Sequence, residues 1–370
     1  MLALILFVFL LPLATAAEPL IDEPAYFAEE EAYLKAFNLD DPENRISLLG
    51  GLEGSSMILK VKDPDGNTVA VFKPTSGNTV HAAEITAYRL CRRLELPVCA
   101  PTVKKTAGAD TLDRFAELLE EIDFKPQEGE RHEGHFEMKE RFRSAMLERI
   151  ASIDELDGAL KSWIKPLVLY QPLGTIADIK KHELYPYLFH DGPTDGGKPI
   201  ELRQCTKIYK PKGCYRAELA ARDLLEQFTG MLVVDALIGD NDRFAGGNVH
   251  LFSLDGRIEP EDGWHRLPAP SLLMLDNGAG FMNNPGRALR VITHSLKITR
   301  FPRSLYDDLL TLEEDYKKNR KTVFTELGIP KKIHHAGKSF YPEKIFHRNF
   351  SGLLRYMRSL DKRYGREAFY

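Results

Sequence analysis

A mostly apolar segment, AELAARDLLEQFTGMLVVDALIG, spans residues 217–239, and its pattern predicts a long helix. The chain has 370 residues, which is enough to bury one sizeable core in two lobes or in two to three modest domains. The predicted helix runs directly into the polar stretch GDNDRFAGGN, residues 239–248. Short polar side chains beside glycines form ordinary turns, but their oxygens also serve as metal ligands.

The overall composition is that of a soluble globular protein, with 43% hydrophobic and 28% charged residues. The net charge is -4, whereas a general nucleic-acid binder is expected to carry a strong basic excess. We therefore expect no nucleic acid among the partners of this chain.

The first sixteen residues have the pattern of a signal peptide. An unbroken apolar run, 2–13, is followed by Ala14 and Ala16, which are spaced as signal peptidase requires. No lysine or arginine precedes the run, and an uncleaved hydrophobic anchor is the alternative. No later segment is apolar enough to span a membrane. These features predict a secreted, secretory-pathway or periplasmic protein without a stable membrane span once the signal is removed.

Residues 17–45 are acidic and contain several prolines, which predicts a leader segment with a short helix near 29–37. From residue 46 the pattern changes to strand, glycine-serine loop, strand, a DPDGN turn and another strand. A helical pattern at 80–96 and an extended segment complete this part, 46–104.

Residues 105–165 are rich in Glu, Lys and Arg and predict a charged helical insertion. The remaining part, 166–370, begins with a short strand that we expect to form a hinge near 169–173. Two short strands follow the long helix, and residues 285–370 are helical in pattern. The predicted fold class is α+β, with a β-rich first lobe containing one main helix and a mostly helical second lobe.

The chain contains four cysteines, and an exported chain with an even number permits two disulfides. Pairing by neighbours closes Cys91–Cys99 and Cys205–Cys214, but the sequence does not decide the connectivity. Isolated thiols remain the alternative. The sequence NFS at Asn349 is also a glycosylation acceptor pattern in a eukaryotic secretory pathway.

The first group of candidate site residues lies in the strand-rich part. The glycine-serine loop GGLEGSS offers free backbone N–H groups for phosphate oxygens, which makes Gly51, Gly54 and Ser55 candidates for nucleotide contact. Lys73 ends an apolar strand, and Glu84 lies about one turn into the following helix. A buried lysine needs a carboxylate partner, and a Lys–Glu pair of this kind holds nucleotide phosphates in kinases.

The second group surrounds the end of the long helix. Asp242 is a candidate to accept a proton from an attacking hydroxyl. Asn248 immediately precedes one strand and Asp276 follows the next, so we expect them to hold Mg²⁺ or Mn²⁺. The order Lys, Glu, Asp, Asn, Asp is the order of parts needed for phosphoryl transfer.

With these motifs the chain resembles the atypical kinases of the phosphoinositide 3/4-kinase-like fold, namely actin-fragmin kinase and the secretory-pathway kinases of the four-jointed and Golgi casein kinase group. The matching stretches are FKP at 72–74, GDNDR at 239–243 and LDNGAGF at 275–281. The resemblance covers roughly residues 46–281, apart from the 105–165 segment. It implies a two-lobed protein-kinase-like fold.

The resemblance also implies roles for the site residues. Lys73 and Glu84 contact the phosphates, Asp242 is the catalytic aspartate, and Asn248 with Asp276 binds the metal. The sequence differs from the family pattern at Asp240, where asparagine is usual, at Phe244, where histidine is common, and in DNG for DFG. The interval from Asp242 to Asn248 is one residue longer than usual.

We therefore expect an exported kinase that transfers the γ-phosphoryl group of ATP to a hydroxyl acceptor, with a protein favoured as the acceptor. Backbone groups at Tyr170 and Gln171 are expected to meet the adenine edge. One alternative is an inactive pseudokinase that acts as a binding or regulatory module. The others are a carbohydrate or lipid kinase and a transferase that moves AMP or an amino acid.

Overall fold

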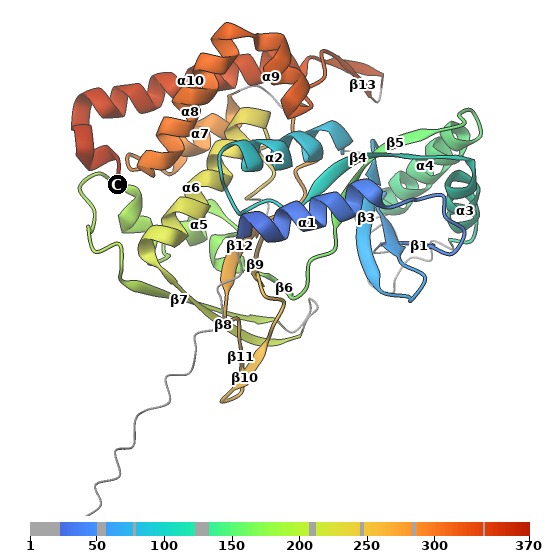
Figure 1. Ribbon diagram of the computed structural model, residues 1–370, viewed down its shortest axis with the longest axis horizontal. Coiled ribbons are helices and arrows are strands. Elements are labelled where there is room, and N and C mark those ends of the chain that lie inside the picture. The colour runs from blue at the N-terminus through green and yellow to red at the C-terminus, as the bar shows by residue number, and fades with distance from the viewer. Residues whose placement is uncertain are drawn as a thin grey trace, which may run out of the picture.

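The computed structural model describes residues 23–49, 57–76, 79–122, 133–206, 212–244, 248–282, 286–335 and 337–370. The expected signal peptide, 1–16, and the three loop residues Gly51, Gly54 and Ser55 lie outside these residues. The described chain is a mixture of helices and antiparallel sheets arranged as two lobes, which confirms the expected α+β fold class (Figure 1).

A five-stranded antiparallel sheet forms the first lobe, in the order β1-β2-β3-β5-β4. Its strands are β1 (Arg45–Leu48), β2 (Leu59–Lys62), β3 (Thr68–Pro74), β4 (Thr102–Ala107) and β5 (Leu156–Ser162). Strand β5 lies between β3 and β4, with Lys73 opposite Ala159. Part of the segment expected as a separate helical insertion, 105–165, therefore belongs to the sheet.

Four helices accompany this sheet in the described part of the chain. Helix α2 (His81–Arg93) is the one main helix expected at 80–96, and α1 (Glu23–Ala36) lies in the leader segment. Helices α3 (Ala109–Glu120) and α4 (Glu133–Ile150) lie in the segment expected as a charged helical insertion. Helix α1 begins six residues before the helix expected at 29–37. The leader segment also holds α3 in place, because the Asp40 carboxylate accepts hydrogen bonds from the backbone N–H groups of Gly108 and Thr111, at 2.9 and 3.2 Å. A carboxylate at this position satisfies the unpaired N–H groups at the start of a helix.

Helix α6 (Ala221–Ile238) is the centre of the second lobe, and almost all of its residues are buried. It ends at Gly239, whose φ of 74° is left-handed and suits glycine at a helix end. Figure 1 shows α6 between α2 and the C-terminal helices. The other helices of this lobe are α5 (Ile176–Ile179), α7 (Arg287–Arg290), α8 (Arg303–Lys318), α9 (Arg320–Leu327), α10 (Pro342–Tyr364) and the short turns η2 (Gln171–Leu173), η3 (Tyr185–Leu188), η4 (Val291–Ser295) and η5 (Gly365–Ala368).

The second lobe also contains three sheets. A three-stranded sheet has the order β12 (Pro270–Met274), β9 (Val249–Ser253) and β6 (Leu167–Leu169). A four-stranded sheet has the order β10 (Glu259–Glu261), β11 (Trp264–Arg266), β8 (Gly213–Ala220) and β7 (Pro199–Thr206), and β13 (Ile333–His335) pairs with β14 (Lys338–Phe340). The second lobe is therefore less purely helical than its sequence pattern suggested.

The two lobes contact each other through backbone hydrogen bonds at the end of β12. The backbone N–H of Met274 donates to the carbonyl of Val98 at 2.7 Å, and Met274 forms a parallel bridge with Cys99. The segment after β12, which carries Asp276, thus begins at a fixed point beside the first lobe.

Both disulfides expected from neighbour pairing are present. Cys91–Cys99 joins the last turns of α2 to the segment before β4, and Cys205–Cys214 closes the β7–β8 hairpin. Asn349 is only 1% exposed inside α10, so the folded chain does not present its NFS pattern for glycosylation. Across the described ranges, we find no helix that is both long enough and apolar enough to cross a membrane.

The Cys91–Cys99 disulfide should stabilise the first lobe by restricting the unfolded chain. We expect the double variant Cys91→Ala/Cys99→Ala to lose about 2–3 kcal/mol of unfolding free energy, measured by urea denaturation, because the bridge closes a short loop. Dithiothreitol should lower the urea concentration at the midpoint of unfolding further for the wild type than for the variant, because the wild type loses two bridges and the variant only one. Equal midpoints for the two oxidised proteins would show that the bridge contributes nothing.

Candidate active site

A buried ion pair joins the first-lobe sheet to α2. Lys73, at the end of β3, directs its Nζ to Oε1 of Glu84 at 2.7 Å. Glu84 is completely buried on the inward face of α2, and Lys73 is nearly so. The pairing expected from the sequence is therefore present. It fixes α2 against the sheet, since separating the two would leave a buried charge without a partner.

A second lysine shares the same carboxylate. Lys161, on β5, donates to Oε2 of Glu84 at 2.8 Å, so each carboxylate oxygen accepts from one lysine. Burial raises the pKa of Glu84, but Lys161 and Lys73 outweigh this effect and hold the pKa well below its usual range. Burial and the nearby Lys73 charge keep the pKa of Lys161 below its usual value despite Glu84.

Sequence reasoning missed Lys161. The residue lies in LDGALKS, a short apolar alternation that marks a strand, but this stretch follows two charged helices within the segment predicted as an insertion. Once β5 is placed beside β3, Lys161 faces the same buried carboxylate as Lys73.

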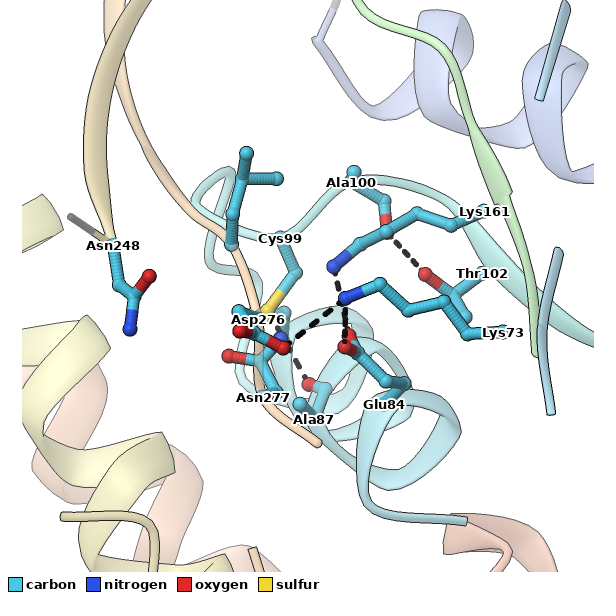
Figure 2. A network of polar contacts seen from close by, with 12 residues as sticks. Lys73, Glu84, Ala87, Cys99, Ala100, Thr102, Lys161, Asn248, Asp276 and Asn277 are labelled. Atoms are coloured by element: carbon cyan, nitrogen blue, oxygen red, sulfur yellow. Dashed lines mark hydrogen bonds and ion pairs between the residues drawn. A yellow bond between two sulfur atoms is a disulfide. The ribbon is translucent and has the colours of Figure 1, made fainter. Parts of the chain in front are cut away.

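Asp276 completes the cluster from the second lobe. Its Oδ1 accepts from Lys73 Nζ at 3.2 Å, and its side chain is partly exposed, unlike those of Lys73 and Glu84. Asp276 has a φ of 55°, a left-handed conformation that is uncommon for residues other than glycine and is found at functional turns. Figure 2 shows Lys73, Lys161, Glu84 and Asp276 converging, with Asn248 set apart across from Asp276.

The polar stretch after α6 is held by local hydrogen bonds. The backbone N–H of Asp242 donates to Oδ1 of Asp240 at 2.9 Å, and the amide Nδ2 of Asn248 donates to the carbonyl of Asp242 at 3.1 Å. Asp242 itself is exposed to solvent. The Asn248 amide is thereby oriented through its nitrogen, which leaves its oxygen for another ligand.

Arg243 connects α6 to the segments that carry Asn248 and Asp276. It is 1% exposed, and its guanidinium donates to both carboxylate oxygens of Asp235 at 3.1 and 3.0 Å. The same group donates to the backbone carbonyl of Asn248 at 2.9 Å, to that of Leu275, and to the side-chain oxygen of Asn277. The asparagine of DNG, which differs from the family pattern, is thus a partner of Arg243.

Asp240 lies where asparagine is usual in the kinase family that the sequence resembles. It is 1% exposed, and its Oδ2 has no hydrogen-bond partner among the described residues. Burial and the nearby Asp235 carboxylate raise the pKa of Asp240 to about 8, although Arg243 lowers it in part. At neutral pH the side chain is therefore mainly protonated, and like asparagine it carries no charge.

The expected hinge residues have contacts of their own. The Tyr170 side chain is buried, and its hydroxyl lies 2.9 Å from His182 Nε2. The backbone N–H of Tyr170 donates to Val249, and that of Gln171 donates to the Gln204 side chain at 3.1 Å. Among the backbone groups expected to meet an adenine, the N–H groups of both residues therefore have protein partners.

A cavity of about 760 Å³ lies beside this hinge. It is lined by Tyr170, Gln171, Pro172, Gly174, Thr175, Asp178, Lys181, His182, Glu183, Glu201, Arg203 and Gln204. Within the described part of the chain, its lining does not include Lys73, Asp242 or Asp276. The cavity thus adjoins the second-lobe side of the hinge rather than the lysine cluster.

Asn248 and Asp276 supply one amide and one carboxylate at the ends of neighbouring strands, β9 and β12. Oxygen donors of this kind suit Mg²⁺ or Mn²⁺, which take few protein ligands and complete their coordination with water and phosphate. The described residues contain no cluster of three or more His, Cys, Asp or Glu side chains that would enclose a metal ion alone. The donor set therefore fits a metal that arrives with a phosphate ligand.

Neither a family model nor a curated protein matches the chain. Among solved structures, a Golgi casein kinase is 13% identical with a TM-score of 0.46, over 87% of this chain and 73% of that chain. A structure of the Golgi casein kinase with Mn/ADP bound is 15% identical with a TM-score of 0.48, over 87% and 74%. Hydra Fam20 with sugar is 16% identical with a TM-score of 0.44, over 88% of each chain.

Replacing Arg243 should disorganise the site even when the charge is kept. We expect Arg243→Lys to lower the unfolding free energy by about 3–5 kcal/mol, because a single ammonium cannot reach Asp235, Asn248, Leu275 and Asn277 together. Urea denaturation measures the loss, with Arg355→Lys on exposed α10 as the matched control. Two variants of equal stability would contradict the role given to Arg243.

The raised pKa of Asp240 predicts a pH-dependent stability. Between the ordinary carboxyl pKa and about 8, the unfolded chain releases this proton before the folded chain does, so stability falls as the pH rises. Asp240→Asn keeps a neutral acceptor for Asp242 and should add about 1–3 kcal/mol at pH 7. Urea denaturation from pH 5 to 8 should show its advantage over wild type increasing with pH. An advantage independent of pH would be incompatible with a protonated Asp240.

Proposed function

We propose that this protein is an ATP-dependent phosphotransferase that acts on a hydroxyl acceptor. The observation that carries the proposal is the buried Lys73–Glu84 pair, whose lysine also reaches Asp276 on the opposite lobe. A lysine held between a helix carboxylate and a second-lobe aspartate is the arrangement that positions nucleotide phosphates for transfer.

Each candidate residue has a role in this proposal. Lys73 is kept charged, because Glu84 and Asp276 raise its pKa above the usual value against the effect of burial, so it binds phosphate oxygens. Asp242 is exposed at the end of the α6 segment, where it orients the acceptor hydroxyl and accepts its proton. Lys161 adds a second positive charge beside the phosphate position.

Asn248 and Asp276 would hold a divalent ion, Mg²⁺ or Mn²⁺, together with ATP. When bound, the ion neutralises phosphate charge and orients the transferred group. Arg243 would hold the backbone that carries these donors, because it donates to the carbonyl of Asn248 and to that of Leu275, the residue before Asp276.

The acceptor that we place first is a protein in the secretory pathway. Two disulfides in the described chain agree with an oxidising compartment, as the apolar N-terminal run in the sequence does. Sugars and lipids are the other hydroxyl acceptors to be included in a test. A pseudokinase is less favoured, because Lys73, Glu84, Asp242 and Asp276 are all retained.

The decisive test is phosphate transfer from labelled ATP to a broad panel of protein, sugar and lipid acceptors. We expect Asp242→Ala to lower kcat by about 100-fold or more, because it loses the proton acceptor. Asp276→Ala should lose activity, and it should also lose the rise in melting temperature that we expect ATP plus Mn²⁺ to give the wild type. Asp113→Ala, which removes an exposed carboxylate from α3, is the matched control and should behave as wild type.

Two results would argue against the proposal. One is a wild-type melting temperature that does not change with millimolar ATP and Mn²⁺. The other is full transfer activity in Asp276→Ala. Intact-mass analysis of the product separates phosphoryl transfer from AMP transfer, since the two adducts differ greatly in mass.

A further inference from the structure

A second cavity lies on the side of α2 that faces the β13 segment, and the proposed reaction does not use it. Its volume is about 420 Å³, and both lobes contribute to its wall. The lining residues are Thr75, Val80, His81, Ala82, Ile85, Arg89, Lys104, Arg149, Gly328, Pro330, Lys332, Ile333, His334 and His335. Glu84, Lys73 and Asp276 are not among these described lining residues, so the cavity is distinct from the lysine cluster.

The cavity is strongly basic. Two arginines, two lysines and three histidines line it, whereas no Asp or Glu does so among the described residues. Four cations around one cavity repel one another unless a counter-charge is present. Asp157 compensates part of this charge, because it pairs with Lys104 at 2.6 Å and also acts electrostatically on Arg149, but it leaves Arg89 and Lys332 unmatched.

The partners of the two arginines are neutral. Arg89 donates to the backbone carbonyls of Thr325 and Glu326 at 3.3 and 3.0 Å, and Arg149 donates to that of Thr75 at 2.8 Å. These bonds fix the guanidinium groups without cancelling their charge. Lys332 is exposed and has no ion pair with any residue that the structure describes. The cavity therefore contains positively charged side chains in fixed positions, and these still have N–H groups that could donate hydrogen bonds to a ligand.

The first turn of α2 adds to this field. Val80, His81 and Ala82 line the cavity, and Val80 supplies no side-chain cap for the helix. The N-terminal end of a helix carries partial positive charge. His81 Nδ1 lies 2.7 Å from Thr75 Oγ1, which also accepts the His81 backbone N–H at 3.3 Å. With Nδ1 engaged by Thr75, the imidazole presents its other nitrogen to further partners.

From this geometry we infer that the cavity behind α2 is a binding site for a phosphate-type oxyanion. Arg149 and His81 would approach the anion from the first lobe, and Lys332 from the second. The anion has two possible sources, free inorganic phosphate or the phosphate of a phosphoserine side chain on a protein. The inference does not depend on phosphoryl transfer, since it involves none of the residues assigned to that reaction.

An anion at this position would also bridge the lobes. It would join α2, α4 and residues 328–335 of the second lobe, and α2 carries the Glu84 that both buried lysines share. Occupancy should therefore reduce movement of α2 relative to β13.

The test uses His81 as a local reporter. Burial lowers its pKa to about 4, with Asp157 opposing and Lys104 and Arg149 reinforcing the shift. Proton NMR of the full protein would follow the histidine resonances, assigned with His81→Gln, during titration with sodium phosphate at constant ionic strength. We expect a saturable shift of the His81 signal and a higher His81 pKa, because the anion stabilises the imidazolium form. Parallel titrations use a phosphoserine peptide and the same peptide without the phosphate.

Lys332→Gln is the test variant, because this exposed side chain makes no contact that folding requires. We expect at least about tenfold weaker binding, the effect of losing one charge-assisted bond. Arg149→Gln should weaken binding similarly, while Arg355→Gln, an exposed arginine on α10, should bind as wild type.

Binding in either the free-phosphate or the phosphopeptide arm supports the site and identifies the source. The inference is overturned by a His81 signal that ignores both ligands, or by a shift that Lys332→Gln and Arg149→Gln leave unchanged. The second result would place the bound anion elsewhere, for instance beside Lys73 and Lys161.

Discussion

The guanidinium of Arg243 is the constraint on which the candidate site depends. A buried arginine cannot lose its proton, so the fold must surround it with acceptors. Here the acceptors come from α6, from the start of β9 and from the loop after β12. Satisfying one charge thus brings the ends of three elements together. Asp242, Asn248 and Asp276 project from these same ends, so their arrangement follows from a group that is itself almost completely buried.

The lysine cluster, where the two lobes meet, is likewise organised around a buried charge. Glu84 is buried completely, and it stays ionised because two lysines reach it from neighbouring strands. With Asp276 included, the cluster holds two positive and two negative charges and is balanced without any ligand. Since Asp276 belongs to the second lobe, this balance also fixes how the lobes meet.

The sequence predicted much of this arrangement, because the order Lys, Glu, Asp, Asn, Asp along the chain is the order of the parts of a phosphoryl-transfer site. Lys73, Glu84 and Asp276 were predicted from strand and helix patterns, and the structure brings the three into contact. The disulfides followed neighbour pairing because both bridges close short local loops. Whether Tyr170 and Gln171 meet a nucleotide, and what Gly51, Gly54 and Ser55 contact, remain predictions.

Other features escaped prediction for physical reasons. Lys161 lies on a strand whose partners are far away in sequence, and pattern alone does not give such pairing. The contacts of Arg243 with Leu275 and Asn277 join residues 32 and 34 positions apart, so no local motif encodes them. The burial of Asn349 likewise depends on how α10 packs, whereas the NFS pattern is purely local.

The placement of β5 has a consequence for how this chain is built. Ala107 and Leu156 are paired at the ends of β4 and β5, so the whole helical excursion between them starts and finishes at one rung of the sheet. In topological terms, α3 and α4 occupy the position of a hairpin loop. A hairpin loop can be lengthened without shifting either strand. Here the added helices contribute Phe115 and Met146 to the core of the first lobe and Arg149 to the basic cavity. The connection between β4 and β5 therefore both packs against the first-lobe core and lines the basic cavity.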